Sequence, residues 1–144
     1  MIEQDTIHLL RECDAGIQMG VSSIDQVLDD VQDSKMRALL SSSKDEHHRL
    51  MTEVQSALDR FHEDGKAPNP MAKTMATVKT NMEMMMKPED ATIAGLITDG
   101  CNRGVKSLSK YLNQYAAADE KAKDICKKLI AMEEQLAKDL RGYL

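Results

Sequence analysis

The chain has 144 residues and a formal net charge of −5, with 42% hydrophobic and 30% charged residues. This length corresponds to about one domain with a sizeable core, and the composition is that of a folded globular protein. Acidic and basic residues are interleaved without a basic stripe, so nucleic acid is not an expected partner. No apolar run approaches the ~18–20 residues of a membrane span.

Three cysteines, Cys13, Cys101 and Cys126, are scattered within helical patterns. An odd number of dispersed cysteines favours buried free thiols over a disulfide framework. Residues 1–5 are acidic in character and lack the basic and apolar regions of a signal peptide. We therefore expect a cytoplasmic protein.

Apolar and small residues recur every three or four positions in the N-terminal half, as they do along one face of a helix. The first helical pattern ends at residues 32–34, where Ser34 is expected to cap the second helix, and Gly65 ends the second. The two stripes are Leu10, Cys13, Ile17, Gly20, Ile24, Val27 and Val31, then Met36, Leu40, Ser43, His47, Leu50, Val54, Ala57 and Phe61.

The C-terminal half continues the helical pattern, and no strand is predicted. A loop at 65–70 leads to a short Met-rich helix, which Pro88 interrupts. Asp90 is expected to cap a fourth helix, and the turn at 116–119 opens a fifth. Their stripes are Ile93, Ile97, Gly100, Gly104, Leu108, Tyr111 and Tyr115, then Ala122, Cys126, Leu129, Glu133, Leu136 and Leu140.

The predicted architecture is a single all-α domain over residues 1–144, an antiparallel four-helix bundle. Short turns predict antiparallel hairpins at 5–64 and 90–142, joined by a crossover at 65–89 that holds the short extra helix. Two hairpins joined by one long crossover is the ferritin-like connectivity.

The two hairpins share the sequence pattern G-x-x-x-G-V-x-S-[I/L]-x-x-x-L. It starts at Gly16 and again 84 residues later at Gly100. We interpret this repeat as a duplicated hairpin related by a pseudo-twofold axis. Chance similarity between amphipathic helices is the alternative.

The chain resembles the small uncharacterised bacterial ferritin-like family over nearly its whole length. Residues 9–16, the stretch from Ala38 to His48, and residues 88–93 carry the resemblance. It implies the four-helix fold and a tendency to self-associate, and it implies no particular activity.

A ferritin-type di-iron centre needs a Glu from each of two helices and Glu-x-x-His from each of the other two. The sequence contains no Glu-x-x-His, and all four histidines lie in its N-terminal half. The mid-helix positions where ligands would project carry Gly16, Gly20, Gly100 and Gly104. We therefore expect neither a di-iron centre nor a resident cofactor.

Counting back from the two turns places His47 level with the first glycine pair and Glu133 level with the second. Three interpretations remain open for these residues. They form a buried pair that fixes the register of the helices. They hold one iron, manganese or zinc ion or a small ligand, with Asp99 or Cys101 as a further ligand. Or Glu133 faces solvent.

Each of the four glycines costs about 1 kcal/mol relative to alanine inside a helix. We expect them to permit close packing, and a vestigial pocket is the alternative. Six of the eleven methionines lie between residues 71 and 86. Of these, we expect Met75, Met82, Met84, Met85 and Met86 to form a self-association surface, with a copper site as the alternative.

The sequence therefore predicts a non-catalytic ferritin-like bundle with a structural or protein-interaction role, assembled as a homodimer. The alternative is a degenerate metal-binding or small-ligand-binding protein that uses His47 and Glu133.

Overall fold

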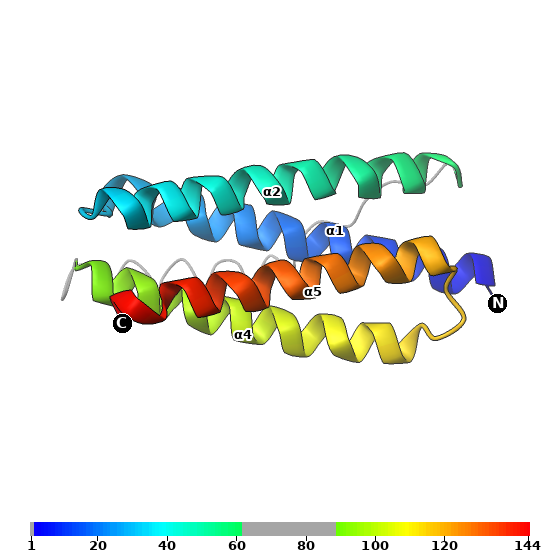
Figure 1. The fold of residues 1–144 in the computed structure, drawn as a ribbon. Coiled ribbons are helices and arrows are strands. Elements are labelled where there is room, and N and C mark those ends of the chain that lie inside the picture. The colour runs from blue at the N-terminus through cyan, green and yellow to red at the C-terminus, as the bar shows by residue number, and fades with distance from the viewer. Residues whose placement is uncertain (1, 62–88) are drawn as a thin grey trace.

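The computed structural model describes residues 2–61 and 89–144, and these ranges form helices joined by turns without a strand (Figure 1). Two short 3-10 helices, η1 and η2, follow the first and the last long helix. The predicted crossover helix lies outside the described residues. The described elements are α1 (Ile2–Val27), η1 (Leu28–Asp30), α2 (Ser34–Asp59), α4 (Asp90–Gln114), α5 (Glu120–Leu140) and η2 (Arg141–Tyr143).

The four long helices pack as an all-α bundle. Helices α1 and α5 contact each other and both remaining helices, whereas α2 and α4 lie on opposite sides of this central pair (Figure 1). Helix α4 begins at the end of the bundle where α1 passes into α2, so α4 runs in the same direction as α2. Helix α5 returns toward that end and therefore runs in the same direction as α1. Among the described helices, none is both long and apolar enough to cross a membrane.

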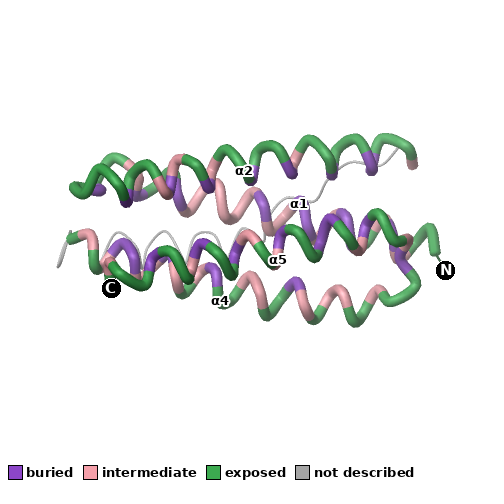
Figure 2. The backbone as a smooth tube through the Cα atoms, viewed as in Figure 1, coloured by how far each residue is buried: buried purple, intermediate pink, exposed green. Residues whose placement is uncertain are grey.

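The predicted stripes are the inward faces of the helices. In α5 all six predicted stripe residues are buried, and in α2 all of them from Met36 to Ala57 are buried, with Phe61 of intermediate exposure just beyond the helix. Figure 2 shows buried positions recurring along the four helices. Amphipathic periodicity therefore determines which face of each helix contributes to the core.

The helix starts differ from the prediction at two places. Asp33, not Ser34, caps α2, because its side chain accepts a hydrogen bond from Met36 N at 2.8 Å. At α4, Glu89 precedes the helix without a side-chain cap, and Asp90 is already helical. The Asp90 carboxylate is engaged elsewhere, by the other hairpin.

Side chains at the start of the first helix of each hairpin accept hydrogen bonds from the loop that connects the two helices of the other hairpin. Asp90 binds the turn between α1 and α2, and the start of α1 binds the turn between α4 and α5. A carboxylate that accepts backbone N–H groups makes strong, charge-assisted bonds. The bonds are Gln32 N to Asp90 Oδ1 (2.8 Å), Asp33 N to Asp90 Oδ2 (2.9 Å), Ala117 N to Asp5 Oδ2 (3.0 Å) and Asp119 N to Thr6 Oγ1 (2.8 Å).

The apolar core consists of two clusters along the bundle. One includes Ile17 of α1 and Leu129 of α5, and the other includes Ile24 and Leu136 of the same helices. Between these two levels lie buried polar side chains, which form a polar layer across the bundle.

Candidate functional site

His47 of α2 and Glu133 of α5 contact each other in this polar layer. His47 is 1% exposed and Glu133 is 8% exposed, and His47 Nε2 lies 2.6 Å from Glu133 Oε1. The two residues that the turn geometry placed at mid-bundle are thus brought together, one from each hairpin. The interpretation in which Glu133 faces solvent is wrong, because the α5 stripe carries it into the core.

Both ring nitrogens of His47 face an oxygen. Nδ1 lies 2.7 Å from the carbonyl oxygen of Ser43, one turn earlier in α2, and Nε2 faces Glu133. Burial lowers the pKa of His47, but the hydrogen bond to Glu133 and its charge, together with the Ser43 carbonyl, outweigh burial and raise that pKa. An imidazolium donates from both nitrogens. When both nitrogens carry protons, the contact is a buried, hydrogen-bonded ion pair.

Cys101 of α4 adds a third polar side chain to this layer. Its thiol lies near Glu133. Burial raises the pKa of the Cys101 thiol well above its usual value, and the nearby Glu133 raises it further. Because the thiolate is the nucleophile and the metal ligand, the raised pKa keeps Cys101 in its unreactive thiol form.

Gly20 of α1 leaves the space that the imidazole occupies. A Cβ at this position would lie 2.9 Å from His47 Nε2 and 3.0 Å from its Cδ2. Gly104 of α4 lies against the same pair, since a Cβ there would be 3.6 Å from Glu133 Oε2, an ordinary contact. The buried imidazole of His47 therefore explains why α1 carries a glycine at position 20.

The other two glycines have different surroundings. A Cβ at Gly16 would make ordinary contacts of 3.7 Å with Leu108 and Leu129. At Gly100, a Cβ would meet no described atom within 4 Å. The described residues make no close contact at Gly100, so close packing at this position stays a prediction.

The predicted metal ligands do not converge. Asp99 is exposed on α4, whereas His47 and Glu133 are buried. Within residues 2–61 and 89–144, no group of three or more His, Cys, Asp and Glu residues is placed to hold a metal ion. Asp99 is thus not a third ligand beside the buried pair.

Asp14 is a buried polar residue to which the sequence pattern assigned no role. It is 1% exposed, and its carboxylate accepts bonds from Gln18 Nε2 at 2.9 Å and Gln55 Nε2 at 3.4 Å. Its position four residues after Leu10, on the same helix face, is the signal that predicts its burial.

The described cysteines are free and buried, as predicted. Cys13 of α1 and Cys126 of α5 hydrogen-bond to each other, and this bond together with burial raises the pKa of the Cys13 thiol. Cys126 Sγ also donates to the Leu108 carbonyl at 3.7 Å. The contact with Cys13 lowers the pKa of the Cys126 thiol, although burial opposes this shift. Both thiols are enclosed in the core, because Cys13 and Cys126 are 0% exposed.

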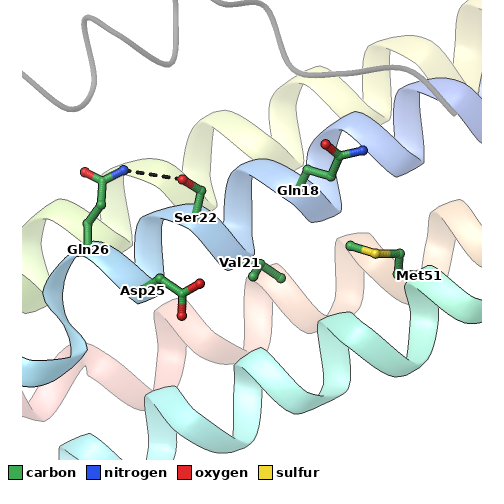
Figure 3. Close-up of a pocket in the computed structure, with 6 residues that line it drawn as sticks. All are labelled: Gln18, Val21, Ser22, Asp25, Gln26 and Met51. Carbon is green, nitrogen blue, oxygen red and sulfur yellow. Dashed lines mark hydrogen bonds between the residues drawn. The ribbon is translucent and has the colours of Figure 1, made fainter.

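A surface depression of about 470 Å³ lies along α1 with one contribution from α2 (Figure 3). Its side chains are half-buried or exposed. Its single acidic group, Asp25, is paired with Lys44. Ser22 accepts a hydrogen bond from Gln26 at 3.4 Å, so the hydroxyl and the carboxylate of this lining each have another partner. The lining residues are Gln18, Val21, Ser22, Asp25, Gln26 and Met51.

Comparisons of the chain with protein-family models, curated proteins and solved structures found no match. The geometry of the polar layer is therefore the main indication of function in this chain.

The substitution Gly20→Ala tests whether the buried ring needs a glycine in α1. The new Cβ would collide with His47, so we expect the free energy of unfolding to fall by about 1–3 kcal/mol, although alanine favours helix by about 1 kcal/mol. At Gly100 the new Cβ would meet no described atom within 4 Å, and Gly100→Ala should raise it by about 1 kcal/mol. Urea denaturation measures both, and similar stabilisation by both variants would contradict the account.

The raised pKa of His47 predicts a pH dependence of stability. The folded pKa exceeds the unfolded one, so the contribution of His47 is complete below the unfolded value of about 6.5 and is lost as the pH rises through the folded value. Within that window the free energy of unfolding falls by at most about 1.4 kcal/mol per pH unit. His47→Gln should abolish this fall, and His48→Gln, at an exposed neighbour, should retain it. Parallel pH profiles of wild type and His47→Gln in urea denaturation would refute the prediction.

Proposed function

We propose that this chain is a non-catalytic helical bundle of ferritin-like architecture with a structural or protein-interaction role. The observation that carries the proposal is the closed polar layer. Both nitrogens of His47 have partners, and Glu133 is buried against His47 with the Cys101 thiol nearby. A general base or a metal ligand needs a lone pair that a substrate or ion can reach, and this buried pair offers none.

Matching offsets support a duplicated hairpin. His47 and Glu133 are 86 residues apart, and the same offset separates the capping residues Asp33 and Asp119. Gly20 and Gly104, which both lie against the pair, carry the 84-residue offset of the sequence repeat. The reciprocal bonds between hairpin turns add to this correspondence. Equivalent residues of the two hairpins thus contact each other at the centre of the bundle.

The sequence is the support for self-association. The large hydrophobic residues exposed in the described part are Ile2 and Leu144, at its two ends, and they form no broad apolar surface. Met is the residue type of adaptable interfaces, and six methionines lie within residues 71–86. The proposed interface residues Met75, Met82, Met84, Met85 and Met86 lie outside the described residues.

The competing proposal is a degenerate site for one iron, manganese or zinc ion, or for a small ligand. The contact between His47 and Glu133 favours it, because both residue types bind zinc. Metal binding would have to separate this buried ion pair, and the loss of one partner from such a pair costs about 3–5 kcal/mol. The closed pair is therefore the better-supported role.

Metal titration distinguishes the two proposals. Untagged protein is titrated with Fe(II), Mn(II) and Zn(II) in a calorimeter, alongside His47→Ala and the exposed control His48→Ala. We expect all three proteins to give the same heats, because both ring nitrogens of His47 already have hydrogen-bond partners. Stoichiometric binding that His47→Ala loses and His48→Ala keeps would establish the metal-binding alternative.

Light scattering tests the homodimer. Coupled to size exclusion, it should give a mass of twice the 16.1 kDa chain over a range of protein concentrations. A constant 16.1 kDa at the highest concentration would remove self-association from the proposal.

A further inference from the structure

The central contact between the two hairpins joins equivalent positions that carry different charges. At both ends of the bundle the equivalent contacts are of the same kind. Asp33 and Asp119 each cap a second helix with a 2.8 Å bond, and an acidic or hydroxyl side chain holds each turn. At the centre the equivalents differ, because one hairpin supplies His47 and the other supplies Glu133.

We propose that the contact between His47 and Glu133 is the specificity determinant of this interface, so that each hairpin fits the unlike hairpin and rejects a second copy of itself. The inference rests on the proposed duplication, which makes residues 47 and 133 equivalent. The partner of each hairpin is the other hairpin of the chain, which carries the opposite charge at the central position.

Pairing of like hairpins would put like groups in contact at this position. Two copies of residues 2–61 would place His47 against His47, and two copies of residues 89–144 would place Glu133 against Glu133. Neither residue is more than 8% exposed, so water cannot screen the repulsion. Like charges that share a buried site, or a buried charge left without a partner, are strongly unfavourable.

In a pair of like hairpins, the residues around position 47 or 133 would not supply the opposite charge that is absent there. Helix α1 presents Gly20 here, α4 presents Gly104 and the Cys101 thiol, and α2 adds the Ser43 carbonyl and the nearby Glu46. In the described structure no cation from these elements is recorded beside Glu133 other than His47. The discrimination between like and unlike hairpins therefore depends on the two residues themselves.

Charge reversal in the full chain tests the proposal. His47→Glu imitates the pairing of two second hairpins, and Glu133→His imitates the pairing of two first hairpins. We expect His47→Glu to lower the folded-to-unfolded ratio by about a hundredfold or more near neutral pH, and to recover at acidic pH as the carboxylates protonate. The loss in Glu133→His should be largest at acidic pH, where both rings are charged.

The double variant His47→Glu/Glu133→His restores unlike groups with their positions exchanged. Its folded-to-unfolded ratio in urea near neutral pH should return to within about tenfold of wild type, because coupled residues do not contribute additively. The matched control His48→Glu/Glu134→His lies on the exposed neighbours and should change the ratio less than either buried single variant. If a single variant does not fold, recovery of helical circular dichroism on adding the second change is the readout.

A double variant no more stable than the worse single variant, or unfolded where both singles fold, would overturn the proposal. So would single variants no more damaging than the exposed control. This failure is distinguishable from failure of the proposed function, which the metal titration and the light scattering of the wild-type chain decide independently.

Discussion

A histidine and a glutamate that face each other in an apolar interior have to satisfy each other, because water does not reach them. His47 and Glu133 do so across the two hairpins, with the Ser43 carbonyl as a further partner of His47 and the Cys101 thiol near Glu133. A buried ion pair adds little net stability by itself, since desolvation opposes the attraction, but the loss of one partner is costly. The contact therefore acts mainly as a constraint on how the hairpins are placed.

The surrounding residues follow from this constraint. Gly20 provides the volume of the imidazole, and apolar clusters lie on either side of the polar layer. Polar bonds at both ends of the bundle then hold each hairpin turn, so the hairpins are aligned at three levels. Both ring nitrogens of His47 have partners within the bundle, and this arrangement is the basis of the proposed structural or interaction role.

Much of the fold could be predicted from the sequence, because burial in a helix bundle is read from a period of three to four residues. Counting back from the two turns places His47 and Glu133 level with the two glycine pairs. The sequence does not show which glycine faces another side chain closely, as Gly20 faces His47. It also assigned Asp90 to its own helix, since a carboxylate that binds a distant turn leaves no local pattern. The exposure of Asp99 depended on the rotation of α4, which a wide stripe determines only loosely.

The protonation of His47 is the most direct test of the central contact. A long-range proton–nitrogen correlation spectrum of isotope-labelled protein, at a pH just below the usual histidine pKa of about 6.5, reports the state of each ring nitrogen. The account predicts that both nitrogens of His47 carry protons and that these exchange slowly with water, whereas those of exposed His48 exchange fast. A His47 ring with one bare nitrogen, or with rapidly exchanging protons, would contradict the closed ion pair.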